Sequence, residues 1–129
     1  MTHKIIRTEQ APAPIGPYNQ GIAAQGQMIF LSGQIPLDPV TNQIVGENNI
    51  TVQIEQVMKN IEAILSEAGA GWSDIVKTTI FLKNMEDFAT VNGIYARFFP
   101  PETAPARSCV EVARLPKDVL VEIECIAMI

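Results

Sequence analysis

The spacing of apolar residues changes along the chain from the period of a helix to that of a strand. Between residues 51 and 68, apolar residues recur at the intervals of a single helix face: Ile54, Val57, Met58, Ile61, Ile64, Leu65 and Ala68. Gly69 and Gly71 follow and end this predicted helix. The segment from Ile75 to Leu82 is instead rich in β-branched residues, which predicts a strand.

A second helix is predicted directly after this strand. Asn84 is a suitable N-cap, and Glu86 and Asp87 follow it in the first turn, where the helix dipole favours acidic side chains. Pro100 and Pro101 end the helix. Its buried face is predicted to consist of Phe88, Val91, Tyr95 and Phe98.

Shorter strands are predicted near both ends of the chain. Residues 4–7 fit a short edge strand, and residues 21–25 and 27–32 fit two strands around a tight turn at Gly26. The stretch 105–127 reads as a closing hairpin, because two apolar-rich segments flank a turn that contains Pro116, Lys117 and Asp118.

The length predicts one domain that covers residues 1–129, and the order of its elements is strands, helix, strand, helix, two strands. Two helices can cover only one face of a sheet of five or six strands. Because the other face also carries apolar residues, we expect the chain to associate with copies of itself, with pockets where the subunits meet.

Composition narrows the possible functions. Hydrophobic residues make up 47% of the chain and charged residues 18%, which predicts a packed core. The net charge is −5 with only nine Lys and Arg, which argues against a nucleic-acid partner. No apolar run approaches the roughly 20 residues of a membrane span, and the N-terminus does not resemble a signal peptide. We therefore expect a cytoplasmic protein in which Cys109 and Cys125, on neighbouring predicted strands, are both reduced.

Several chemistries lack the residues that they require. The only histidine is His3, so a Ser-His-Asp or Cys-His system has no suitable base. One histidine and two separated cysteines do not make a zinc site, and no phosphate-binding glycine motif is present. The expected site contains no metal and no cofactor, and its chemistry would use arginine, carboxylates, hydroxyls, backbone amides and water.

Polar residues interrupt the apolar pattern of the predicted closing hairpin at Arg107, Cys109, Glu122 and Glu124. A guanidinium fork suits a carboxylate ligand, and a carboxylate can orient water, so together they predict a pocket for a small organic acid. The alternative for Arg107 is a surface ion pair. Cys109 has no neighbouring base and is interpreted as a pocket wall. Glu122 and Glu124 share a strand face, and the pattern leaves the choice between them open.

Three further positions are candidates for ligand contact, each with a structural alternative. Prolines before Tyr18 fix an extended path, so its ring either meets a ligand or packs on the core. Ser32 and Gly33 end a predicted strand, where small residues either admit a ligand or simply form a turn. Asn92 lies beside the buried face of the second helix and can reach either a ligand or solvent.

Five segments, taken together, resemble the Rid family of reactive-intermediate (enamine/imine) deaminases, also called the YjgF or RidA family. The similarity runs essentially from end to end and is greatest to the RidA subgroup. The segment 105–118 is the most specific of the five, and the other four are Ile15-Gly16-Pro17-Tyr18-Asn19-Gln20, Ser32-Gly33-Gln34-Ile35-Pro36, Asp74-Ile75-Val76-Lys77-Thr78-Thr79 and Asp87-Phe88-Ala89-Thr90-Val91-Asn92.

The resemblance implies a chorismate-mutase-like α+β subunit and a homotrimer with a cleft at each of three interfaces. It implies that Arg107 binds the substrate carboxylate and that Glu122, rather than Glu124, positions or activates water. The residues implied to line the pocket are Tyr18, Ser32, Gly33, Asn92 and Cys109. The run 98–105 is shorter than its counterpart in many relatives, which affects the outer lip of the cleft.

The implied activity is hydrolysis of 2-imino or enamine acids, such as 2-aminoacrylate, to 2-keto acids and ammonia, with no cofactor or metal. Enzymes that use pyridoxal phosphate, such as serine and threonine dehydratases, release these intermediates. Two other functions are considered: a non-catalytic trimer that binds 2-keto acids, and an RNA-acting translation inhibitor, an activity attributed to some relatives. The low content of basic residues argues against the second.

Overall fold

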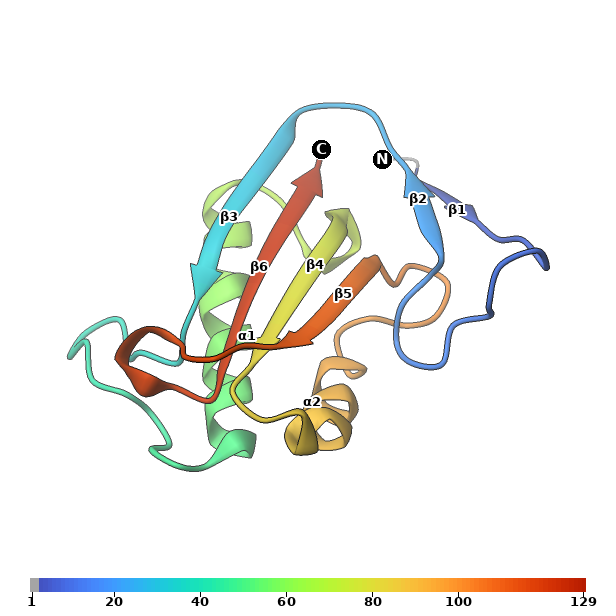
Figure 1. Ribbon diagram of the computed structural model, residues 1–129. Helices are drawn as coiled ribbons and strands as arrows, with labels where there is room; N and C mark the ends of the chain where they lie inside the picture. Colours follow the sequence, from blue (N-terminus) through green and yellow to red (C-terminus); the bar gives the residue numbers. More distant parts are fainter. Residues whose placement is uncertain (1–2) are drawn as a thin grey trace.

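The computed structural model describes residues 3–129, and its centre is a four-stranded sheet in the order β3-β6-β4-β5 (Figure 1). Strand β6 runs antiparallel to both of its neighbours, whereas β4 and β5 are parallel. The four strands are β3 (Met28–Gln34), β4 (Ile75–Leu82), β5 (Ala106–Glu111) and β6 (Val121–Met128). A separate two-stranded sheet pairs β1 (Lys4–Ile6) with β2 (Gly21–Ala23). A short strand at the start of the chain was predicted, but this pairing was not.

Two helices, α1 (Ile50–Glu67) and α2 (Phe88–Tyr95), cover one face of the four-stranded sheet, which confirms the predicted α+β architecture (Figure 1). The Oδ1 atom of Asn49 accepts a hydrogen bond of 3.1 Å from the Val52 amide and so caps α1. Three short 3-10 helices complete the chain: η1 (Trp72–Asp74), η2 (Met85–Asp87) and η3 (Pro116–Asp118). Within the described residues, no helix has both the length and the apolar character that crossing a membrane requires.

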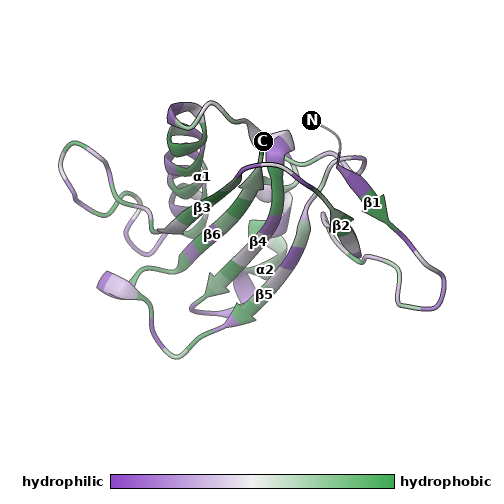
Figure 2. Cartoon of the chain, turned by 90° about the horizontal axis from the view of Figure 1, so that it is seen from above, coloured by the Kyte–Doolittle hydropathy of each residue, from purple (hydrophilic) through white to green (hydrophobic). Residues whose placement is uncertain are grey.

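The core lies between the helices and the sheet. Along β6 every second residue is buried, namely Val121, Ile123, Cys125 and Ala127, and these residues face the helices. The residues between them face the other side, which we call the open face of the sheet. In Figure 2 the strands carry long green stretches, whereas purple residues alternate with green ones along α1.

The open face is apolar at its two edges. Phe30, on β3, has 68% of its surface exposed, and Met28 and Val110 are also exposed. Phe30 and Met28 pair with Ile126 and Met128 of β6, which places all four side chains on this face. Nothing among residues 3–129 covers these side chains, in agreement with the expectation that two helices cover one face only.

The predicted closing hairpin is wrong. Strand β5 does not pair with β6, because β4 lies between them and pairs with both. The predicted turn does exist as η3, in which Lys117 and Asp118 have positive φ angles of 56° and 58°. The longer connection 112–120 carries the chain past β4, and α2 is the crossover that lets β5 run parallel to β4.

The hairpin predicted around Gly26 is also not formed. Strand β2 pairs with β1, and β3 pairs with β6. Two backbone hydrogen bonds between Gln27 and Ile129, of 2.6 and 3.0 Å, fix the start of β3 to the end of the chain. The turn residue was identified correctly, since Gly26 has φ 134°, but the strands that it separates belong to different sheets.

Two smaller predictions need correction. Asn84 caps η2 through a 2.9 Å hydrogen bond from the Glu86 amide, and α2 begins only at Phe88. Cys109 and Cys125 lie on β5 and β6, which are not adjacent because β4 separates them. Both thiols are free, as predicted.

Gln53 joins two loops to α1 and provides a test of the fold. Its side chain is 98% buried, donates to the Gly46 carbonyl at 3.0 Å and accepts from the Leu120 amide at 2.8 Å. We expect Gln53→Ala to lower the free energy of unfolding by about 2–4 kcal/mol, because both backbone groups lose their partner. Urea denaturation measures this change. Glu55→Ala is the control, because Glu55 lies two residues further along α1 and its side chain is exposed. This substitution should change the free energy of unfolding by less than about 0.5 kcal/mol.

Candidate functional site

Arg107 projects from β5 toward α2. It pairs in register with Thr78 of β4, whose side chain faces the helices, so Arg107 lies on the same side of the sheet. Its Nη1 atom donates a 2.7 Å hydrogen bond to Oδ1 of Asn92 on α2. The side chain is partly buried, and β5 is an edge strand of the four-stranded sheet.

Three aromatic rings surround this guanidinium. Its central carbon lies 5.1 Å from the ring centre of Tyr95, 5.2 Å from that of Tyr18 and 5.7 Å from that of Phe88. All three distances fall within the range of cation–π attraction. We call Tyr18, Phe88 and Tyr95 the aromatic cage. The sequence assigned Phe88 and Tyr95 only to the core, and their contact with Arg107 was not predicted.

Asn19 holds the segment that brings Tyr18 to this cage. Its buried Nδ2 group donates to the carbonyls of Pro101 and Ala104, at 2.9 and 2.8 Å, and its backbone amide donates to the Pro105 carbonyl. The Tyr18 hydroxyl in turn accepts a 3.1 Å hydrogen bond from the Ile15 amide. Sequence reasoning missed Asn19, although an asparagine after a proline-rich extended segment is a common device for binding backbone groups.

Arg107 has no acidic partner among residues 3–129. The ion pairs formed there are Arg97 with Glu55 at 3.9 Å and Arg114 with Asp118 at 2.7 Å. A guanidinium has five N–H donors, and within residues 3–129 only one of them donates to another side chain, that of Asn92. A partly buried cation with free donors is well suited to an anionic ligand, and the planar fork suits a carboxylate.

Asn92 and Cys109 lie beside Arg107. Cys109 follows Arg107 by two residues on β5 and faces the same side. Burial raises the pKa of its thiol, and the nearby Arg107 charge opposes that effect only in part. A thiol with a raised pKa is a poor nucleophile at neutral pH, which agrees with its interpretation as a wall of the site.

A second group of predicted residues lies elsewhere, around Glu122. A Cβ atom added to Gly33 would overlap Oε2 of Glu122, so the carboxylate lies directly against the Gly33 backbone and a larger residue there would displace it. The ladder between β3 and β6 is irregular between Leu31 and Gln34, where Ser32 and Gly33 occur. Burial, with repulsion from Glu124 as the smaller cause, raises the pKa of Glu122 above its ordinary value of 4.5.

The two groups are on opposite faces of the sheet. Glu122 pairs with Phe81 on β4, and Phe81 is an odd number of residues from Thr78, the partner of Arg107. Since successive strand residues point to opposite faces, Arg107 faces the helices and Glu122 the open face. Within one chain, therefore, Tyr18, Asn92, Arg107 and Cys109 lie together, and Ser32, Gly33 and Glu122 lie together. The two predicted catalytic residues, Arg107 and Glu122, therefore do not lie in one site within a single chain.

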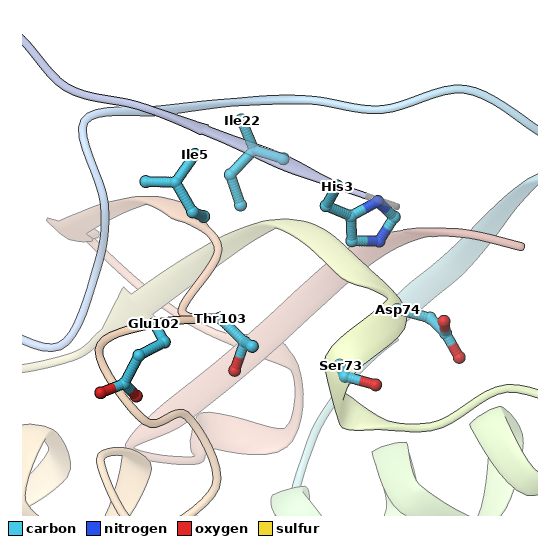
Figure 3. Close-up of a pocket in the computed structure, with 7 residues that line it drawn as sticks. All are labelled: His3, Ile5, Ile22, Ser73, Asp74, Glu102 and Thr103. Carbon is cyan, nitrogen blue, oxygen red and sulfur yellow. The ribbon is translucent and has the colours of Figure 1, made fainter. Parts of the chain in front are cut away.

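A cavity of about 380 Å³ lies apart from both groups, between β1, β2 and the start of β4 (Figure 3). It contains none of the predicted site residues, and its lining is His3, Ile5, Ile22, Ser73, Asp74, Glu102 and Thr103. Neither ring nitrogen of His3 has a hydrogen-bond partner in the described part of the chain. In residues 3–129, no three His, Cys, Asp or Glu side chains are grouped as a metal site requires.

Known proteins resemble the chain over its full length. A RutC family protein of Synechocystis is 64% identical over 129 residues, which cover 100% of this chain and 98% of the relative. The 2-iminobutanoate/2-iminopropanoate deaminase of Escherichia coli K12 is 54% identical over 127 residues, 97% of each protein. The crystal structure of E. coli TdcF with bound serine has a TM-score of 0.73 and 48% identity, and the match covers 98% of both chains.

A family model described as Endoribonuclease L-PSP matches residues 8–129, which include every predicted site residue. This match agrees with the identities above and with the arrangement of two helices on a mixed sheet. The chain therefore belongs to the Rid (YjgF/RidA) family.

Proposed function

We propose that this protein is a cofactor-independent deaminase that hydrolyses small 2-imino acids, and their enamine tautomers, to 2-keto acids and ammonia. The observation that carries the proposal is the Arg107 guanidinium, which is partly buried, lacks an acidic partner within residues 3–129 and retains free donors. Relatives 54% identical to this chain are named 2-iminobutanoate/2-iminopropanoate deaminase, and a related structure holds serine, which is a small carboxylate.

The proposed site is shared between subunits. Arg107 and Glu122 face opposite sides of one sheet, so a single ligand can meet both only if the Arg107 side of one copy packs against the open face of another. The exposed apolar residues Met28, Phe30 and Val110 on the open face favour such packing. A homotrimer with three equivalent clefts is the assembly that we propose.

In the proposed mechanism, Arg107 binds the substrate carboxylate through its fork, and the imine carbon faces a water held by Glu122. The Glu122 carboxylate takes one proton from the water as the water oxygen bonds to the imine carbon, and it passes this proton to the imine nitrogen. In the resulting carbinolamine, Glu122 carries the hydroxyl proton to the amine nitrogen, the C–N bond breaks, and the 2-keto acid and ammonia leave. An imine is already electrophilic, so positioning and a general base suffice.

The non-catalytic binding function requires the same Arg107 site without turnover, so an activity measurement separates it from the deaminase. RNA cleavage, which the description of the family model names, is not favoured in this chain. Its net charge is −5, and neither residue group contains a cluster of basic side chains.

Arg107 substitutions give the first test. With 2-aminoacrylate generated by a serine dehydratase, we expect the wild type to accelerate loss of the imine. Arg107→Ala should lower kcat/KM by roughly 100-fold or more, because a charge-assisted bidentate contact is lost. Arg107→Lys keeps the charge without the fork and should be intermediate. A wild type that binds 2-keto acids but leaves imine loss unchanged would establish the binding function instead.

The pH dependence tests Glu122. If its carboxylate is the base, kcat/KM rises with pH through an apparent pKa above 4.5, because the carboxyl must lose its proton to act. Glu122→Gln should abolish this rise and lower turnover more than ligand binding.

Glu124→Gln is the matched control for that test. It removes the neighbouring negative charge, so the rise should move to lower pH while activity is retained. A large loss of activity in Glu124→Gln, with none in Glu122→Gln, would reverse the assignment of the base.

Mixed assemblies test whether the site is shared. When equal amounts of Arg107→Ala and Glu122→Gln subunits are unfolded and refolded together, we expect about a quarter of the clefts to contain both intact residues. Activity should then return to about a quarter of the wild-type value, well above that of either parent variant. If both residues of a cleft came from one chain, the mixture would be no more active than the parents.

A further inference from the structure

A buried hydrogen bond between two hydroxyl groups lies close to Arg107. The hydroxyls of Thr78, on β4, and Tyr95, on α2, share a hydrogen bond of 2.7 Å. Thr78 is 1% exposed and Tyr95 0% exposed, and neither hydroxyl makes another hydrogen bond among residues 3–129. Since a buried pair of this kind adds little net stability over apolar residues of the same shape, stability alone does not account for it.

The position of this pair relates it directly to Arg107. Thr78 and Arg107 are register partners on the adjacent strands β4 and β5 and face the same side. Tyr95 reaches this side from α2, with its hydroxyl on Thr78 and its ring centre 5.1 Å from the guanidinium carbon. The hydrogen bond therefore fixes one end of the ring whose face borders the cation.

The Tyr95 ring attracts the guanidinium through its quadrupole. The face of the ring carries partial negative charge, and the ring centre lies 5.1 Å from the guanidinium carbon. The rings of Tyr18 and Phe88 and the amide oxygen of Asn92 restrict Arg107 further. A guanidinium restricted in this way keeps its free donors in one orientation, which lowers the entropic cost of binding a ligand.

We propose that Thr78 and Tyr95 are positioning residues for Arg107, because their shared hydrogen bond fixes the ring on which the guanidinium lies. This contact would thereby set how tightly the site holds a carboxylate. The inference rests on the proposed function, since it takes Arg107 as the carboxylate-binding residue.

Three variants separate positioning from stability. Tyr95→Phe and Thr78→Val each leave one buried hydroxyl without a partner, so each should lower the melting temperature by several degrees. The double variant Thr78→Val/Tyr95→Phe removes both hydroxyls and should regain most of that loss. In all three variants the ring beside the guanidinium has lost its hydrogen bond to β4.

The probe is 2-oxobutanoate, titrated calorimetrically into the assembled protein. We expect its Kd, and the KM for the imine, to rise roughly fivefold in all three variants, with kcat changed less. Thr78→Ser keeps the hydroxyl and should bind the probe like the wild type. In the double variant, weak binding together with recovered stability is the signature of a positioning role.

Recovery of wild-type affinity in the double variant, together with its stability, would overturn this inference, since the pair would then act through stability alone. Unchanged affinity in Tyr95→Phe would overturn it as well, while leaving the proposed function intact. If the wild type bound no 2-oxobutanoate and accelerated no imine loss, both the inference and the proposed function would fail.

Discussion

The alternation of side chains along β-strands is the constraint on which the proposed site depends. It directs Arg107 toward α2 and Glu122 toward the open face, and no rotamer carries a side chain through a hydrogen-bonded sheet. The same alternation buries Val121, Ile123 and Cys125 under the helices. The same alternation therefore determines both the core and the proposed site. Every second residue of β6 packs under the helices, and the residues between them, such as Glu122, lie on the open face.

The Arg107 side of the sheet shows how a cation is held without a counter-ion. Ring faces and one amide oxygen provide a weakly negative surrounding that orients the guanidinium but does not neutralise it. A carboxylate from the protein in the same place would have formed a strong pair and occupied the fork. No acidic residue among residues 3–129 pairs with Arg107, so the positive charge of the guanidinium is not neutralised. An overall negative protein can thus retain a local attraction for small anions.

Periodicity predicted the elements well because it reflects local physics. The stripe from Ile54 to Leu65 became α1, and the β-branched segment became β4 with the predicted bounds. Strand pairing was not predictable in the same way: residues 105–127 carry every local sign of a hairpin, yet β4 separates the two strands. Which strands become neighbours depends on contacts between distant segments. Motif resemblance selected Arg107 and Glu122 as site residues, but only the register revealed that they face opposite sides.

The hydrogen bonds of Asn19 join the segment that carries Tyr18 to the loop 101–105. Because its amide donates to carbonyls at both Pro101 and Ala104, the path of that loop fixes where the segment carrying Tyr18 can lie. The length of this loop therefore helps to fix the position of the Tyr18 ring beside the Arg107 guanidinium. An insertion or deletion there would move Tyr18 relative to Arg107 without replacing either residue. Loop length is accordingly a variable that can change the spacing of these side chains while their identities stay the same.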